Sequence, residues 1–495
     1  MTADLLVPAR EDTLPPAGRP LRHRVRVLAA LLPFVVIGAA RATYFAEGDT
    51  FWAVRTGAEI LRQHTIVLPD SFSWTVPGRL WHPNSWLYDV LLHLADERGG
   101  RAGLGLAAML SVTASGCGVL VAGRFLGART RPLLVVCFLA MPVLTVWLSA
   151  RPQTTTYALL PVTVALAGAT VQWRGRRFLL GLAGLISVTA LWVNLHLAAL
   201  AAVFCAVAGL GLLLAVRRSS WPALVPRAAL VVAATVLGCA CSALGWSVVG
   251  SALATRDAST ELITEWAPLW RTSTVCQATW LVAALALALT LASWRRRPDD
   301  ELLPVWTGAT TVLLLLGVSA ARFSAMALVL ALPAAARWVG ETEWTSRQWR
   351  RTAAWLAPRL VVGLTVVLTG VTLFRLPHVG EPIEGTSTRA LVNAVPAGCR
   401  VLNENDEGGW ITYLRADEGV LVAQDGRNDV YGVAGLERVG RLLAGAPGSL
   451  AELAREDVRC LLLDPDRPIV AQARAAGWVQ LAAEAHRVLL VAPPD

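Results

Sequence analysis

Long apolar runs recur along most of the chain, and they constrain its fold more than any other feature. A helix that crosses a membrane needs about 20 mostly apolar residues. The candidate runs are roughly residues 25–44, 104–123, 133–150, 155–171, 178–195, 197–216, 228–246, 275–294, 302–320, 323–339 and 360–376. Only 16% of the residues are charged and 55% are hydrophobic, whereas ordinary domains carry roughly 25% charged residues. The sequence therefore predicts a polytopic α-helical membrane protein with about 11 transmembrane helices.

The arginines predict the orientation of these helices, because cytoplasmic loops are enriched in basic residues. Clusters fall in alternate loops, whereas the loops between them carry one or two arginines each. The clusters lie in residues 19–26, 124–131, 174–177, 217–227, 295–297 and 337–351. We therefore expect a cytoplasmic N-terminal tail, 1–24, and a multi-span domain, 25–376, in the cell membrane. The loop 45–103 and the segment 377–495 are predicted to be extracytoplasmic. The net charge of +9 is too scattered to indicate nucleic-acid binding.

Both outer segments are predicted to be structured. In the loop 45–103, residues 51–63 and 86–97 have the spacing of amphipathic helices that lie in the membrane interface. The segment 377–495 carries short apolar runs at 401–403, 420–423, 460–463 and 488–491, which predict a small α/β domain. No glycine-rich phosphate loop follows any of these runs, so nucleotide binding is poorly supported.

The cysteines and histidines do not indicate a metal site. Cys239 and Cys241 have no matching second pair, and the seven histidines are too scattered for a zinc pattern. Cys399 and Cys460 both lie in the predicted outer domain, where an oxidising environment would allow them to pair. Sequence alone does not show that they are close.

Asp49 is the strongest candidate for a chemical role. It follows the first apolar run and precedes an amphipathic helix, at the predicted outer boundary of the membrane. A carboxylate there can be partly desolvated, which suits a general base. The alternative is that Asp49 and Glu47 only end one helix and cap the next.

Further polar residues lie at the predicted outer ends of the apolar runs. Charged groups at membrane depth tend to face a cavity or a partner, and arginine can bind a phosphate through two parallel hydrogen bonds. The alternative for each arginine is snorkelling to lipid headgroups. These candidates for substrate binding are Arg151, Gln153, His196, Glu265 and Arg322.

The outer domain and the tryptophans add two weaker signals. Asp425 and Arg427 lie in a polar turn after a predicted strand, where α/β domains place ligand sites. The alternative is a hydrogen-bonded turn that an Arg–Asp pair stabilises. Most of the 20 tryptophans are expected to anchor the membrane interface, and one or two could stack on a sugar or a lipid headgroup.

Together these features resemble the GT-C-fold membrane glycosyltransferases. The resemblance covers nearly the whole chain, and its motifs are short: Asp49-Thr-Phe-Trp, Leu68-Pro-Asp-Ser-Phe-Ser-Trp-Thr, Arg151-Pro-Gln, Asn194-Leu-His and Asp425-Gly-Arg-Asn-Asp-Val-Tyr-Gly. It implies transfer of a sugar from a polyprenyl-phosphate carrier to an extracytoplasmic acceptor. In that family the acid of the first loop is the catalytic base, and Asp49 is the matching position. Glu47 precedes it by two residues, so which of them acts as the base stays open.

The predicted function is therefore a membrane glycosyltransferase in which Arg151 or Arg322 stabilises the departing lipid phosphate. Its partners would be a membrane lipid, a polyprenyl-phosphate-linked sugar and a glycan, lipid or protein acceptor. No cofactor is named with certainty, and a divalent cation is left open. The competing hypotheses are a non-catalytic GT-C-like protein that binds lipid or glycan, and a transporter or flippase. Transporters usually carry internal repeats, and we find no convincing repeat.

Overall fold

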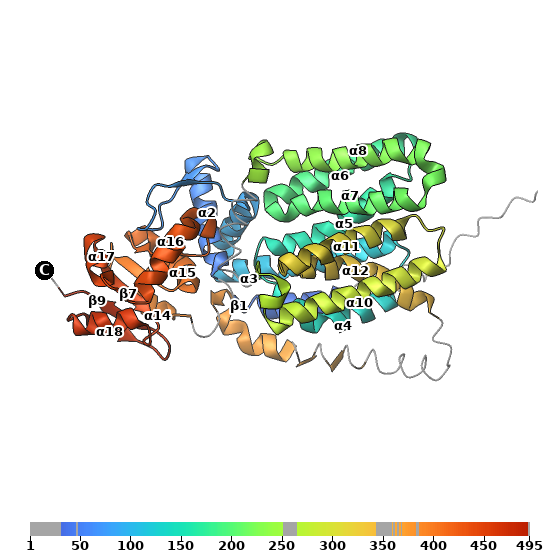
Figure 1. The fold of residues 1–495 in the computed structure, drawn as a ribbon. Coiled ribbons are helices and arrows are strands. Elements are labelled where there is room, and N and C mark those ends of the chain that lie inside the picture. The colour runs from blue at the N-terminus through green and yellow to red at the C-terminus, as the bar shows by residue number, and fades with distance from the viewer. Residues whose placement is uncertain are drawn as a thin grey trace, which may run out of the picture.

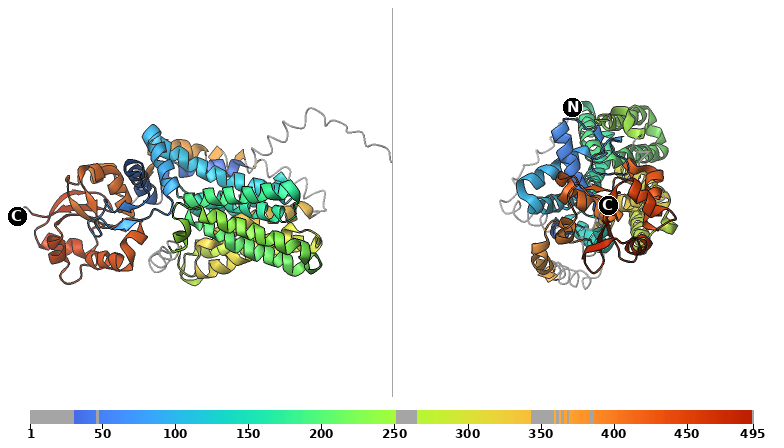
Figure 2. Two further views of the ribbon diagram at one scale, coloured as in Figure 1. Left: turned by 90° about the horizontal axis from the view of Figure 1, so that it is seen from above. Right: turned by 90° about the vertical axis from the view of Figure 1, so that its left-hand side faces the viewer.

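The computed structural model describes residues 31–45, 48–250, 265–342, 386–493 and parts of 359–382. A bundle of long helices makes up one part of the molecule, and a domain built around a mixed sheet lies at one end of it (Figure 1). The first outer segment, 48–100, lies at this same end, beside the C-terminal domain (Figures 1 and 2). Segments from the two ends of the sequence therefore meet at one end of the bundle.

Eight helices are long and apolar enough to cross a membrane within the part of the chain that the structure describes. Many of their exposed side chains are large and apolar, among them Leu139, Leu180 and Leu285, which suits a lipid environment. They are α3 (Trp86–Phe125), α4 (Thr130–Leu144) extended by a 3₁₀ turn to Trp147, α6 (Gly175–Leu195), α7 (Ala201–Val216) preceded by a 3₁₀ turn from Leu197, α8 (Trp221–Ala240) preceded by a 3₁₀ turn from Arg218, α10 (Thr274–Arg296), α11 (Leu302–Ser319) and α12 (Arg322–Glu341).

The prediction of a polytopic α-helical membrane protein is confirmed. α5 (Gln153–Thr170) corresponds to the apolar run 155–171 and packs against α3, α6, α11 and α12. The first predicted span is represented by the short apolar helix Leu31–Arg41. The runs 25–44 and 360–376 both reach beyond the described residues, so the expected number of helices stays a prediction.

Two helices form most of the first outer segment. α2 (Asp49–Gln63) covers the predicted helix 51–63. The predicted helix 86–97 is the first part of α3, which continues into the bundle after a break at Gly100, where φ is 54° and ψ is −142°. Between α2 and α3, β2 (Leu68–Pro69) and β3 (Leu80–Trp81) form an antiparallel pair.

The C-terminal domain contains a five-stranded sheet in the order β6-β5-β7-β9-β8. The strands β6, β5 and β7 run parallel to one another. The strand β9 is antiparallel to both of its neighbours, β7 and β8. The bounds are β5 (Arg400–Asn403), β6 (Leu421–Val422), β7 (Val458–Leu463), β8 (Val479–Ala483) and β9 (Val488–Val491). The helices are α14 (Arg389–Asn393), α15 (Asn405–Arg415), α16 (Asn428–Leu443), α17 (Ser449–Arg455) and α18 (Pro468–Ala475). The predicted α/β domain is thus confirmed, whereas the exact boundaries of the three predicted regions stay predictions.

The strand β8 was not predicted from the sequence. It forms an edge of the sheet, and most of its side chains are exposed. A strand that is buried on neither face has no continuous apolar run by which it could be recognised. The other four strands correspond to the four predicted runs.

The first outer segment packs directly on the C-terminal domain. Ser73 forms a parallel bridge with Val422 of β6, which adds a residue of the outer segment to that edge of the sheet. The indole N–H of Trp74 donates to the backbone oxygen of Val401 at 2.9 Å. The ring of Phe51 of α2 packs at a tilt against Trp410 of α15, with ring centroids 4.6 Å apart and planes inclined by 56°. A short parallel pair, β1 (Tyr44–Phe45) with β4 (Glu381–Pro382), adds a further connection.

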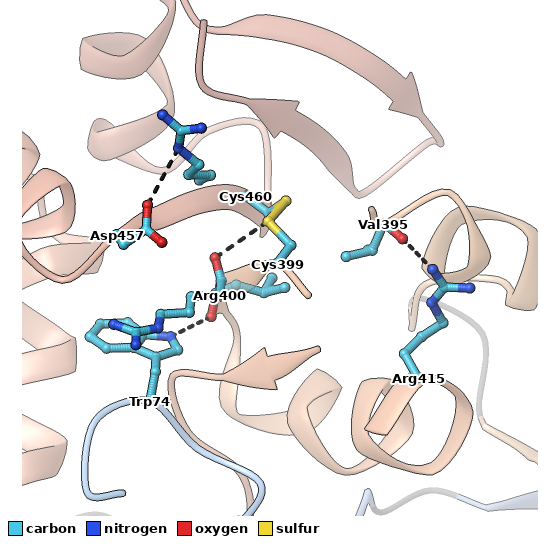
Figure 3. The surroundings of a disulfide bond; sticks show 9 residues. Trp74, Val395, Cys399, Arg400, Arg415, Asp457 and Cys460 are labelled. Atoms are coloured by element: carbon cyan, nitrogen blue, oxygen red, sulfur yellow. Dashed lines mark hydrogen bonds and ion pairs between the residues drawn. A yellow bond between two sulfur atoms is a disulfide. The ribbon is translucent and has the colours of Figure 1, made fainter. Parts of the chain in front are cut away.

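A disulfide joins Cys399 to Cys460 of β7 in the C-terminal domain (Figure 3). The two cysteines allowed by the sequence to pair are therefore bonded, and the bond links the residue directly before β5 to β7. The described loops that join α3 to α4, α5 to α6, α7 to α8 and α10 to α11 lie at the end of the bundle away from the C-terminal domain (Figure 1). Arg337 of α12 pairs with Asp300 at 2.6 Å and with Glu341 at 2.8 Å. The cytoplasmic location of that end stays a prediction.

Candidate active site

A cavity of about 600 Å³ lies where the helix bundle meets the C-terminal domain. Its lining divides into two chemically different halves. The half within the bundle is apolar and includes Leu200, Phe204, Val236, Phe323 and Met326. The half next to the C-terminal domain is polar, and charged side chains from both parts of the molecule lie between the halves.

Asp49 stands at this boundary, at the first turn of α2. Its Oδ2 accepts from Nε and Nη2 of Arg151 at 2.9 and 2.5 Å, and its Oδ1 accepts from the indole N–H of Trp52 at 3.2 Å. Arg151 also donates from Nη1 to Glu265 at 3.1 Å. One guanidinium therefore binds two carboxylates that lie far apart in the sequence. These side chains are about a quarter exposed, so solutes can reach them.

Arg322, the first residue of α12, provides a second cation in the same cavity. Its Nη2 donates to Oε1 of Gln153 at 3.3 Å, and its guanidinium lies 4.3 Å above the ring of Trp266. Neither partner carries a negative charge. Because a stacked guanidinium keeps its edge N–H groups free to donate, Arg322 is suited to bind an anion in the cavity.

His196 lines the cavity at the end of α6. Its Nδ1 lies 2.8 Å from the hydroxyl of Thr156, which accepts a hydrogen bond from the indole N–H of Trp192 at 3.1 Å. Since the indole can only donate, the hydroxyl proton of Thr156 is available for Nδ1. A neutral His196 that accepts from Thr156 at Nδ1 would carry its proton on Nε2. This N–H would be a third donor near the two arginines.

Asp425 and Arg427 lie deeper in the wall on the side of the C-terminal domain. Arg427 is 1% exposed and donates to Asp425 at 2.7–3.0 Å, and it forms an ion pair with Asp70 at 2.9 Å. Burial alone disfavours its charge, but Asp425, Tyr431 and Asp70 together raise the pKa of Arg427 well above its usual value. The arrangement ties the first outer segment to the turn that follows β6.

Gly426, between these two residues, brings the turn against Asp49. A Cβ atom at position 426 would lie 2.0 Å from Oδ1 of Asp49 and 2.8 Å from Nε1 of Trp52. Such distances are impossible without movement of one side. Only glycine therefore allows the C-terminal domain to approach Asp49 this closely.

The structure thus brings six of the residues predicted from the sequence to one cavity. Asp49, Arg151, Gln153, His196, Arg322 and Arg427 line it. Glu265 reaches the same group through Arg151, while Asp425 is buried behind the wall and Arg427 contributes to the wall. Glu47 lies outside the described residues. The roles of all these residues stay predictions.

Sequence reasoning missed several members of the site. Thr156 and Tyr157 orient His196 and Gln153, but they resemble ordinary residues of an apolar helix. Asn84, Ser85, Asn428 and Asp429 line the polar half and were not named as candidates. The one available signal was the position of Gly426, Asn428 and Asp429 inside the Asp425–Gly432 motif. Among the described residues, no group of three or more His, Cys, Asp or Glu side chains could hold a metal ion.

Comparison with solved structures finds proteins whose fold is similar to that of this chain. ArnT from Cupriavidus metallidurans bound to undecaprenyl phosphate is similar with a TM-score of 0.58 and 13% identity, covering 97% of this chain and all of that one. Its apo state gives a TM-score of 0.58 and 12% identity, with coverages of 96% and 100%. The Archaeoglobus fulgidus oligosaccharyltransferase tethered with an acceptor peptide gives 0.57 and 11%, with coverages of 90% and 69%.

No family model matches the sequence, and no curated protein matches it. At 11–13% identity the structural likeness shows the fold alone. The predicted GT-C fold is therefore confirmed.

Proposed function

We propose that this chain, which has the GT-C fold, is a membrane glycosyltransferase. It would transfer a sugar from a polyprenyl-phosphate carrier to an acceptor at the outer face of the membrane. The observation that carries the proposal is that Asp49, Arg151 and Arg322 share one cavity with an apolar half. An acid, two cations and an apolar surface are what such a donor and its transfer step require. One of the similar structures holds undecaprenyl phosphate, a lipid of this class.

The transfer step forms one bond and breaks another at the anomeric carbon of the sugar. The acceptor oxygen forms a bond to this carbon, while the bond from the carbon to the phosphate oxygen breaks. The electron pair of the broken bond leaves with the lipid phosphate. Asp49 takes the proton of the acceptor hydroxyl, as a general base.

Arg322 and Arg151 would bind the phosphate that leaves. Donors that are fixed before the reaction stabilise developing charge without reorganisation. Arg151 already serves Asp49 and Glu265, so a phosphate that accepts from it competes with both carboxylates. Competition at Arg151 would loosen its hold on Asp49 and make this carboxylate a better proton acceptor.

The apolar half of the cavity would accommodate the first units of the polyprenyl chain. Phe204 lines it and is 55% exposed, so the lining continues to the surface of the bundle. A lipid could thus enter from the bilayer while its phosphate stays at the boundary. The predicted orientation places this boundary on the outer side.

Replacement of the proposed base tests the function. Asp49→Asn keeps the size of the side chain and should lower transfer by about 100-fold or more, since general bases contribute 10²–10⁴-fold. Cell-envelope glycans and lipid-linked sugars would be compared at equal expression, and the unused donor should accumulate. Asp299→Asn, an exposed change at the other end of the bundle, is the matched control.

Glu47→Gln separates the two candidate acids. If Asp49 is the base, this variant should keep most of its activity. Unchanged transfer in Asp49→Asn with loss in Glu47→Gln would move the base to Glu47. Unchanged glycans and donor levels in both variants would favour the non-catalytic alternative.

A further inference from the structure

The polar half of the cavity contains groups that the proposed transfer step does not use. They come from α2, from the segment that enters α3, and from the start of α16. They are Trp52, Trp81, Asn84, Ser85, Asn428 and Asp429. Gly426 meets Asp49 at Oδ1, whereas Arg151 binds Oδ2. The polar half of the cavity therefore lies on the side of Asp49 that faces the C-terminal domain. Arg151 lies on the opposite side of Asp49.

The hydrogen-bonding capacity of these groups is largely open. The side chains of Asn84 and Asn428 have no hydrogen bond to another described residue, although Asn428 is 8% exposed. The hydroxyl of Ser85 donates to Oδ1 of Asp89 at 2.9 Å and keeps its lone pairs as acceptors. The carboxylate of Asp429 can accept hydrogen bonds from a ligand. A ligand here meets amide donors and several acceptors within a small space.

Two tryptophans complete this half. The rings of Trp52 and Trp81 have centroids 6.4 Å apart and planes inclined by 69°. Indole rings offer broad apolar contact at low entropic cost. A ligand with C–H groups on its faces and hydroxyls around its edge would satisfy both the rings and the polar groups. This is the surface of a sugar ring.

Two acidic side chains, Asp429 and Asp49, line this half. Burial raises the pKa of Asp429, and the neighbouring Arg427 opposes this rise. The cation in the wall, Arg427, is already paired with Asp70 and Asp425. Because like charges repel strongly where water is scarce, an anionic ligand should be disfavoured here.

We propose that this half of the cavity is the acceptor subsite and that it binds an uncharged carbohydrate. The inference rests on the proposed function, because it places the acceptor hydroxyl beside Oδ1 of Asp49. Asn84, Asn428 and Ser85 bind the ring hydroxyls, and Asp429 accepts from one of them. Asp429 also makes the subsite reject acidic sugars.

Direct binding to the full-length protein in lipid nanodiscs tests the acceptor class. The probes are a set of neutral oligosaccharides, the same set with hexuronate units, and a Ser/Thr-rich peptide. The neutral set should contain the tightest ligands, and the hexuronate set should bind at least about tenfold more weakly. A peptide that binds more tightly than every saccharide would overturn the proposal.

Variants assign the binding to this half of the cavity. Asn84→Ala and Asn428→Ala should each weaken the binding of neutral saccharides by roughly tenfold. Asp429→Asn should reduce the discrimination against hexuronates by about the same factor. Asp457→Asn, which changes an exposed carboxylate of the same domain, is the control and should leave both affinities unchanged. Binding that none of the three site variants alters would contradict the proposal.

Undecaprenyl phosphate, measured in the same preparations, separates this inference from the proposed function. Arg322→Gln should weaken the binding of this lipid, whereas Asn84→Ala and Asp429→Asn should not. If the lipid binds through Arg322 and no saccharide binds, the acceptor proposal fails alone. If the lipid does not bind, the proposed function fails, and the acceptor proposal fails with it.

Discussion

At the scale of single residues, the site depends on the close contact between Asp49 and Gly426 of the C-terminal domain. Its two carboxylate oxygens are directed differently, one to Arg151 and one to Trp52 beside Gly426. Its position at the outer boundary was predictable, because the end of an apolar run is visible in the sequence. Its partners were not, since Arg151 lies 102 positions away and only the fold brings the two together.

Gly426→Ala should reduce transfer by about tenfold to a hundredfold, because a Cβ there displaces Asp49 and small misplacements of catalytic groups can cost up to that much. Gly440→Ala is the control: it lies in α16 with no atom within 4 Å of the added Cβ. Transfer assays on both variants at equal expression would check this. Equal activity of the two variants would contradict the proposed closeness at Asp49.

Arg427→Met should lower the free energy of unfolding by about 3–5 kcal/mol, because it leaves the buried carboxylates of Asp70 and Asp425 unpaired. Arg438→Met breaks two ion pairs of a partly exposed side chain and should cost only about 1 kcal/mol. Thermal unfolding of the purified proteins in detergent provides the comparison. A smaller loss for Arg427→Met than for Arg438→Met would show that the buried ion pairs contribute little stability.

At the scale of elements, the break at Gly100 allows the two parts of α3 to pack in different surroundings. The part before Gly100 packs against α2 at the end of the bundle next to the C-terminal domain, and the part after it enters the bundle. The backbone angles of Gly100 are accessible almost only to glycine. Gly99, directly before it, does not adopt a positive φ.

Gly100→Ala should therefore destabilise the protein by about 1–3 kcal/mol through backbone strain. Gly99→Ala should be tolerated, because neither added Cβ meets another atom within 4 Å and only the backbone differs. Thermal unfolding of both variants measures this. Equal midpoints would show that the helix straightens without cost.

The sequence predicted elements well where burial leaves a pattern. The bundle helices and the strands β5, β6, β7 and β9 were recognisable as apolar runs, whereas the exposed β8 was not. It also predicted separate helices over 86–97 and 104–123, and the break at Gly100 divides α3 between these two stretches. The polar half of the cavity could not be predicted, because Asn84 and Asp429 meet only through the docking of the C-terminal domain.

At the scale of the whole molecule, the described outer segment and the C-terminal domain lie at one end of the bundle (Figure 1). The arginine pattern predicts that this end is outside the cell. The disulfide between Cys399 and Cys460 (Figure 3) is of the kind that persists in oxidising compartments. It agrees with this orientation.

Cysteine labelling tests the orientation in intact cells. In a variant with Cys117 and Cys241 replaced by Ser, Asp466→Cys should react with a membrane-impermeant maleimide. Asp299→Cys, at the opposite end of the bundle, should react only after the membrane is permeabilised. The reverse order of labelling would contradict the predicted orientation.

Because α2 packs on α15, the site of a newly made molecule can be complete only after both helices have been synthesised. Arg55 donates to the backbone oxygen of Thr412, and the two residues are 357 positions apart. At about 5–20 residues per second, the ribosome needs roughly 20–70 seconds to produce the second after the first. Asp49 is therefore made early but gains Gly426 and Asp429 beside it only near the end of synthesis. A chain that stops short would carry Asp49, the proposed base, without the proposed acceptor subsite.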